Sequence, residues 1–346
     1  MSLPHIHDSI QKRLAQLDFD ALWRGFRPVK FAVYDDSTCF LDGQYVPKTD
    51  EFIANTSILY QGEFIAIWKI TESIESIDFD ELTSKIVHEM FHAFQQLSNE
   101  SRYPNEIEAV QKYSYERTHL SIKLHEASLL KQCFIRDDKN TFDDFLKCRK
   151  TRYQANPFET TYEAQVEQIE GSAQYVELLA LTQLDAQKGQ SAWEHLFEKI
   201  QDPQSYFPIR VISYAIGAAV LRCLPKAMFQ KITAPSSIPF ALAVLAGVEA
   251  VNLDIPLDVR IDQSLDAYRK KTTQIIQGAL QKNECVLQGE YPLLGLNIYD
   301  ARCDGQYLTS TYFVMVEDDG ASRVLHGNFV IELNASGKVV RVYNQA

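Results

Sequence analysis

The chain has 346 residues, of which 46% are hydrophobic and 11% aromatic, so it can bury a sizeable core and disorder is not expected. A formal net charge of −12, with no run of Lys or Arg, argues against a nucleic-acid partner and against anionic membrane surfaces. The length predicts one large domain followed by a small one.

Nothing in the sequence points to a membrane or to export. No apolar stretch approaches the roughly 18 residues that a spanning helix needs. The first residues lack the basic and then apolar pattern of a secretory signal. The six cysteines are scattered without paired spacing, which is typical of reduced thiols rather than of a disulfide or Cys–zinc framework. We therefore expect a cytoplasmic location and no membrane partner.

The first third of the chain predicts short helices and a small sheet. Residues 9–26 have apolar positions at helical spacing and predict one or two short helices. Residues 30–47 and 58–70 are rich in β-branched and aromatic side chains and contain Asp-Gly and Gln-Gly turn signals. These two stretches predict a small antiparallel sheet.

The centre of the chain predicts helices and the end predicts strands. A helix is expected over 78–100, and a helical pattern then runs from Asn105 to about Ala186, interrupted at Asn156-Pro157; a further helix is expected over 209–224. From Val286 apolar and polar residues alternate between glycine-containing turns, as in an antiparallel meander or small barrel. We predict an α+β fold with a mainly helical domain over 1–280 and a small all-β domain over 281–346.

The stretch KIVHEMFHAFQ, residues 85–95, carries the strongest chemical signal. His88 and His92 are four apart, so a helix places both imidazoles on one face, where they can bind one metal ion. Zinc matches such nitrogen ligands best, and the carboxylate of Glu89 stands beside the same face. We expect one zinc ion here and look for a third ligand.

The segment 160–181 offers the third ligand. One stripe of a predicted helix carries five polar side chains, and for most of them a solvated charged face is the simplest interpretation: Glu163, Glu167, Glu170, Gln174 and Glu177. Gly171 is costly inside a helix unless another backbone approaches closely, as beside the metal-binding helix. Glu170 is the first choice for the ligand and Glu167 the second.

These two motifs together resemble those of the gluzincin metallopeptidases. The resemblance rests on His-Glu-Met-Phe-His at 88–92 and on Glu-Gly-Ser-Ala-Gln-Tyr at 170–175, which is similar to the glutamate helix of aminopeptidase-like gluzincins. It implies that His88, His92 and Glu170 bind zinc and that Glu89 is the general base, which activates a zinc-bound water to attack a peptide carbonyl.

The resemblance covers about residues 58–225. It also implies that the strand 62–70, just before the metal helix, is an edge strand that holds the substrate backbone. The sequence departs from the aminopeptidases in two ways: a helical insertion over about 100–155 separates the motifs, and no Gly-Ala-Met-Glu-Asn motif is present. Aminopeptidase specificity is therefore not implied.

Several residues are candidates for supporting roles. Tyr214, on the predicted helix 209–224, is proposed as the donor to the oxyanion that forms when water attacks a carbonyl. Arg210, one turn earlier, is suited either to bind a substrate carboxylate or to pair with an acidic residue near the metal. Glu163, Glu167 and Asp78 are candidates for orienting the zinc histidines.

The sequence thus predicts a zinc-dependent hydrolase, a peptidase acting on a peptide or protein substrate. The alternative is a catalytically inactive, zinc-stabilised scaffold that binds a peptide or protein. Glu89 disfavours this alternative, because a purely structural zinc site needs no base. A third interpretation, a protein without metal in which the motif arises by chance, predicts no zinc at all.

Overall fold

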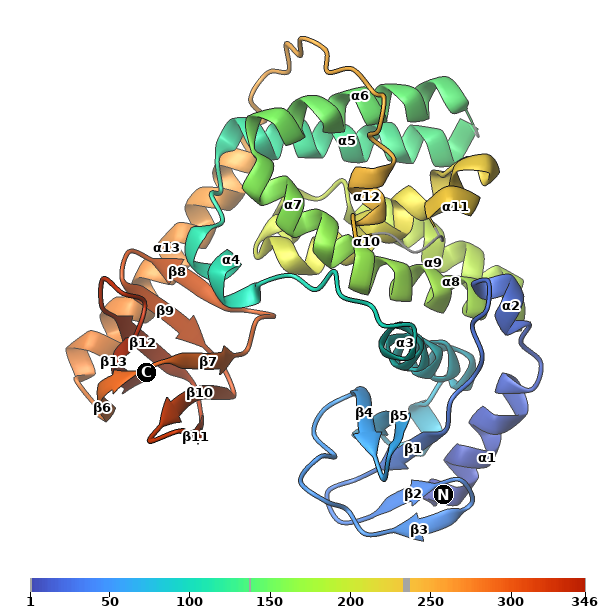
Figure 1. Ribbon diagram of the computed structural model, residues 1–346, viewed down its shortest axis with the longest axis horizontal. Coiled ribbons are helices and arrows are strands. Elements are labelled where there is room, and N and C mark those ends of the chain that lie inside the picture. Colours follow the sequence, from blue (N-terminus) through green and yellow to red (C-terminus); the bar gives the residue numbers. More distant parts are fainter. Residues whose placement is uncertain (1, 137, 233–236, 346) are drawn as a thin grey trace.

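Figure 1 shows the computed structural model, which describes residues 2–136, 138–232 and 237–345. Three regions follow one another along the chain: an N-terminal sheet with two short helices, a helical centre and C-terminal strands. In this view the N-terminal sheet and the C-terminal strands lie on opposite sides below the helical centre (Figure 1). Helices and strands are segregated along the chain, so the predicted α+β fold class is confirmed.

The N-terminal region packs a helix on a five-stranded sheet. Its elements are α1 (Leu3–Leu14), α2 (Phe19–Leu22), β1 (Phe31–Tyr34), β2 (Cys39–Leu41), β3 (Gln44–Val46), β4 (Thr56–Tyr60) and β5 (Glu63–Lys69). The strand order is β3-β2-β1-β5-β4. The predicted antiparallel sheet is wrong in one pairing, because β1 and β5 run parallel. The long connection between them, which includes β2 to β4, makes this pairing possible.

The expected edge strand is also corrected. Strand β5, which contains most of the predicted edge stretch, lies inside the sheet between β1 and β4, and its neighbour β4 is the edge strand on that side. Ile65, Ala66 and Ile67 of β5 are buried, as is usual for a strand with a neighbour on each side. The apolar side chains of this stretch correctly predict a strand. They favour an interior position in the sheet over an edge position.

Helix α3 (Phe79–Leu97) carries the histidine motif. Asp78 caps its N-terminus by accepting hydrogen bonds from the backbone N–H groups of Asp80 and Glu81, and it also pairs with Lys188. The buried face of α3, which includes Ile86, Val87, Met90 and Phe91, shares one core with Ala173, Val176 and Ala180 of α8 (Ser172–Leu184). This packing sets the histidine-bearing helix α3 against α8, the helix that directly follows Glu170 and Gly171.

The other central helices form a second core. They are α4 (Glu106–Lys112), α5 (Arg117–Arg136), α6 (Lys139–Ala155), α7 (Pro157–Val166), α9 (Ala186–Lys199), α10 (Ile209–Cys223), α11 (Lys226–Ile232) and α12 (Phe240–Ala243), with 3-10 turns η1 (Ile74–Ser76) and η3 (Pro203–Tyr206). The predicted interruption at Asn156-Pro157 is confirmed, since α6 ends at Ala155 and α7 begins at Pro157. A π turn, η2 (Glu167–Gly171), joins α7 to α8.

The C-terminal region begins with α13 (Val259–Lys282), a helix that was not predicted from the sequence pattern. The strands that follow are β6 (Cys285–Tyr291), β7 (Leu293–Leu296), β8 (Arg302–Asp304), β9 (Tyr307–Ser310), β10 (Phe313–Asp318), β11 (Ala321–His326), β12 (Phe329–Leu333) and β13 (Val339–Asn344). They form two antiparallel sheets, β11-β10-β7 and β6-β13-β12-β9-β8, with a shared apolar core. Among the described residues no helix has the length and apolar character needed to cross a membrane.

Candidate metal centre

Helix α3 places His88 and His92 together because they are one turn apart on the same face. Their ring centroids are 4.8 Å apart. Each side chain is only partly buried, with 12% and 15% of its surface exposed, so both rings remain accessible from a cavity. The local geometry of the motif is therefore the one that the sequence predicts.

Glu170 reaches this histidine pair from the π turn η2. Its Oε2 atom lies 3.2 Å from Nε2 of His92 and 3.7 Å from Nε2 of His88, and the three ligand atoms lie within 4.8 Å of one another. Across the described part of the chain, this is the one group of three His, Cys, Asp or Glu side chains close enough to hold a metal ion. Glu170, the first choice for the third ligand, therefore lies close enough to share a metal ion with both histidines.

The π turn explains why Glu170, and not Glu167, faces the histidines. Glu163 and Glu170 are seven apart, so an unbroken α-helix would put them on the same face. Instead Glu163 contacts Lys123 and Arg152, whereas Glu170 faces α3. Glu167 points away from the histidines and forms a bidentate ion pair with Arg149. The expected single stripe of glutamates is wrong because the π turn rotates the helix face.

Gly171 does admit a neighbouring backbone, but from a different helix than expected. A Cβ atom at Gly171 would lie 2.7 Å from Cα of Gly217, which belongs to α10 and not to the metal helix. Likewise, a Cβ atom at Gly217 would lie 2.9 Å from Cα of Glu167. The two glycines let α10 approach the π turn closely and bring Arg210 and Tyr214 toward Glu170.

The far nitrogens of both imidazoles have partners. Nδ1 of His88 lies 2.9 Å from Oε2 of Glu177, and Nδ1 of His92 lies 2.8 Å from Oε1 of Gln95. These acceptors leave the Nε2 atoms to face Glu170, which is the arrangement of metal-bound histidines. The three proposed orienting residues are wrong: Glu163 and Glu167 are held by cations of α5 and α6, and Asp78 caps α3.

Arg210 of α10 holds the other oxygen of Glu170. Its guanidinium donates to Oε1 of Glu170 at 3.0 Å, to Glu106 at 2.8 Å and to the hydroxyl of Tyr214. Of the two roles considered for Arg210, the structure favours pairing with acidic residues, since all three guanidinium nitrogens are engaged. Glu170 therefore offers Oε2 alone toward the histidines.

The carboxylates around the two histidines favour positive charge on the imidazoles. Burial would lower the pKa of His88, but the neighbouring carboxylates of Glu170 and Glu177 raise it well above its usual value. Burial likewise opposes ionisation of Glu170, yet the neighbouring His92 and His88 hold its pKa well below the usual range. Burial raises the pKa of Glu89. The site is thus built around carboxylates that stabilise positive charge.

A cavity of about 260 Å³ opens onto these residues. Its walls come from six parts of the chain: residues 55–57 at the start of β4, helix α3 with Glu89, residues 103–106, the π turn with Glu170, helix α10 with Tyr214, and the loop after β7 with Tyr299. The rings of Tyr214 and Tyr299 both lie over the Arg210 guanidinium, at 5.0 and 5.1 Å from the ring centroids. The C-terminal region thus contributes directly to the cavity wall.

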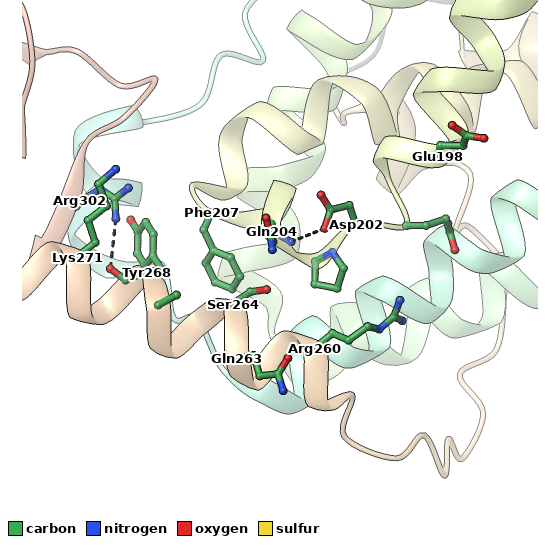
Figure 2. Close-up of a pocket in the computed structure, with 13 residues that line it drawn as sticks. Glu198, Asp202, Gln204, Phe207, Arg260, Gln263, Ser264, Tyr268, Lys271 and Arg302 are labelled. Atoms are coloured by element: carbon green, nitrogen blue, oxygen red, sulfur yellow. Dashed lines mark hydrogen bonds between the residues drawn. The ribbon is translucent and has the colours of Figure 1, made fainter.

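A larger cavity of about 810 Å³ lies between η3, α13 and β8. Figure 2 shows Arg302 and Lys271 at one end, Tyr268 and Phe207 in the middle, and Arg260 at the other end. None of the candidate metal ligands lines it. The smaller cavity is therefore the candidate site, because a reactive site needs convergent functional groups more than it needs volume.

The helical insertion supports the π turn with buried charges. Three carboxylates and three cations form one ion-pair cluster, with side chains at most 2% exposed: Glu126, Glu163, Glu167, Lys123, Arg149 and Arg152. His119 joins it through Glu163. The expected solvated glutamate face is thus wrong at Glu163 and Glu167, because the insertion supplies cations that cover it.

Comparisons with known protein families, with curated proteins and with solved structures find no match to this chain.

Proposed function

We propose that the protein is a zinc-dependent hydrolase of gluzincin type that cleaves peptide bonds. The observation that carries the proposal is the convergence of His88, His92 and Glu170 on one point, with the carboxylate of Glu89 lining the same cavity. The two histidines come from α3, and Glu170 comes from a π turn more than 70 positions later. A shared function accounts for the meeting of these three side chains better than local sequence does.

The donor set fits zinc. Two imidazole nitrogens and one carboxylate oxygen are a three-residue set typical of catalytic zinc, which keeps a further coordination position open. When bound, zinc would act as a Lewis acid and would lower the pKa of a coordinated water. Glu177 and Gln95 support the set, because their acceptor oxygens keep protons on Nδ1 of the two histidines.

Glu89 is the proposed general base. Its carboxylate lines the cavity, and no described residue donates a hydrogen bond to it. Burial raises its pKa toward neutrality, which strengthens it as a base. In the proposed reaction Glu89 takes a proton from the attacking water and delivers it to the nitrogen of the leaving amine.

Tyr214 is the proposed donor to the substrate oxyanion. Its hydroxyl accepts a hydrogen bond from Arg210, which leaves its own proton for another acceptor in the cavity. Burial and then the charge of Glu170 raise the pKa of Tyr214 well above its usual value, so the phenol stays protonated. A protonated donor fixed before the reaction begins is what oxyanion stabilisation requires.

Strand β4 is the proposed holder of the substrate backbone. It is an edge strand, and Thr56 and Ser57 at its start line the cavity beside Asn55. An edge strand presents unpaired backbone groups to which an extended peptide can add as a further strand. This arrangement favours a peptide or protein substrate. The strand proposed to hold the substrate backbone is thus β4 instead of the neighbouring strand 62–70.

The experiment measures zinc content and peptide cleavage in three variants. We expect about one zinc per chain in the wild type, much less in Glu170→Ala, and wild-type content in the control Glu194→Ala, which alters an exposed carboxylate of α9. Glu89→Gln should keep zinc and lose cleavage of a mixed peptide library. Zinc binding without cleavage in the wild type would favour the inactive scaffold, and a wild type without zinc would overturn the metal site.

A further inference from the structure

We propose that Gln95 is a positioning residue that fixes two of the three ligands at once, by orienting His92 and by holding the π turn that presents Glu170. The inference rests on the metal site proposed above, but not on the peptidase activity. Gln95 lies on α3 three residues after His92, and it is 5% exposed. Nothing in the sequence pattern distinguishes it from the neighbouring Gln96.

The amide of Gln95 connects the two ligand-bearing segments. Its Nε2 donates to the backbone carbonyl of Ile169 at 2.8 Å and to Oγ of Ser172 at 3.0 Å, while its Oε1 lies 2.8 Å from Nδ1 of His92. Ile169 is the residue directly before Glu170. A single side chain therefore spans from one metal ligand to the neighbour of another.

This network determines which nitrogen of His92 carries the proton. The carbonyl of Ile169 can only accept a hydrogen bond, so the Gln95 atom next to it must be the NH₂ group. The Gln95 atom next to His92 is then the oxygen, which can only accept, so Nδ1 of His92 must be the N–H. Nε2, which lies 3.2 Å from Oε2 of Glu170, is then the nitrogen that can give up its proton to a metal ion. Gln95 thus selects the imidazole tautomer that can bind a metal ion.

The same amide stabilises an unusual backbone. A π turn is rare and is held only where the surroundings stabilise it, and such turns occur often at functional sites. The hydroxyl of Ser172 donates to the carbonyl of Gln168 at 2.5 Å, and Gln95 binds both that hydroxyl and the carbonyl of Ile169. Loss of the Gln95 amide would remove two bonds from the turn that aims Glu170.

Two variants of Gln95 and one control separate the roles. Gln95→Met keeps the side-chain length but removes both the donor and the acceptor. Gln95→Glu keeps an acceptor for His92 but cannot donate to Ile169. The control is Gln168→Met, because Gln168 is also a buried amide at the π turn, and its bonds go to Phe240 and Glu100 and not to a ligand.

The first measurement is the zinc affinity of the purified chain, by competition with a chromophoric chelator. We expect Gln95→Met to bind zinc roughly 10–100-fold more weakly, the range seen when residues that orient metal ligands are removed. Gln95→Glu should also bind more weakly, because the π turn loses its donor, whereas Gln168→Met should keep wild-type affinity. Wild-type affinity in Gln95→Met, or an equal loss in Gln168→Met, would overturn the proposal.

The second measurement is the NMR spectrum of the histidine side chains in the zinc-saturated protein, in which the proton on Nδ1 of His92 can donate to residue 95. The wild type and Gln95→Glu should show this Nδ1 proton protected from exchange with water, and Gln95→Met should lose the protection. A general loss of stability would not single out the Nδ1 proton of His92. If the wild type binds zinc but cleaves no peptide, only the peptidase function fails; if it binds no zinc, this inference fails together with the metal site.

Discussion

The contact between Gly171 and Gly217 gives a prediction whose size follows from the structure. In Gly171→Ala the new Cβ would lie 2.7 Å from Cα of Gly217 and 3.3 Å from the carbonyl oxygen of Tyr214. Carbon atoms pack at about 3.5–4.0 Å, so α10 and the π turn must separate by about 1 Å. That separation moves Arg210 and Tyr214 away from Glu170.

We expect two effects from this substitution. Overpacking costs about 1–3 kcal/mol, and a separation of two backbones by about 1 Å belongs in the upper half of that range, about 2–3 kcal/mol. Alanine recovers about 1 kcal/mol of helix propensity, so the net loss in the free energy of unfolding is about 1–2 kcal/mol. Zinc affinity should fall by roughly 10–100-fold, because the residue next to Glu170 is displaced. Urea unfolding and chelator competition measure the two effects separately.

The matched control is Gly189→Ala. Its Cβ would lie 2.5 Å from Cα of Thr182, in a helix–helix contact that involves no candidate ligand. This variant should be destabilised to a similar degree and should keep its zinc affinity. The double variant Gly171→Ala/Gly217→Ala should cost less than the sum of its parts, because one separation relieves both clashes. An unfolding midpoint at Gly171→Ala equal to that of the wild type, or an equal loss of zinc affinity in Gly189→Ala, would refute the reasoning.

Three further predictions concern the buried charges and the cavity wall. Burial opposes ionisation of Glu163 and Glu126, but ion pairs hold the pKa of both carboxyls below the ordinary value of 4.5. The ion pairs therefore stabilise the folded chain above pH 4.5, and this stabilisation should be lost as the pH falls further. Urea unfolding midpoints measured from pH 7 to pH 3 test this. Arg149→Met should destabilise the chain by about 3–5 kcal/mol, measured by urea unfolding, because it leaves Glu167 buried and unpaired. Tyr299→Ala should keep zinc and change the residue preference in a peptide-library digest, because the cavity loses an aromatic wall.

Each of these predictions can fail on its own. A urea midpoint that is constant down to pH 3 would contradict the direction of the carboxylate pKa shifts. An Arg149→Met/Glu167→Met double variant should be far more stable than Arg149→Met, and equal stability would contradict the ion-pair argument. For the cavity wall, Tyr312→Ala removes a tyrosine that is 75% exposed and does not line the cavity, so it should cleave like the wild type.

The sequence predicted the parts of the site that depend on local spacing. His88 and His92 share a face because four residues make about one helical turn, whatever the surroundings. Glu170 was chosen because the adjacent Gly171 indicated a close approach of another backbone. Both inferences use information within a few residues of the ligand. The choice against Glu167 could not be made in this way, since it depends on a π turn held by side chains from other helices.

The sequence could not predict partners that are distant along the chain. The buried environment of Glu163 and Glu167 depends on cations from α5 and α6, and nothing near these glutamates indicates them. The order of the N-terminal strands is a similar case. Strand β5 is rich in apolar and β-branched side chains, but whether such a strand is central or at an edge depends on which strands pair with it.

The sequence by itself determined the helix with its two histidines and the α+β succession of elements, and it narrowed the third ligand to Glu170 or Glu167, because periodicity and turn chemistry act over a few residues. Only the tertiary structure decided that Glu177 and Gln95 orient the histidines, that β4 borders the cavity and that Tyr299 completes its wall. The physical reason is that hydrogen bonds and side-chain packing act between atoms that are close in space, and the sequence position of a residue does not state which distant segment will lie beside it.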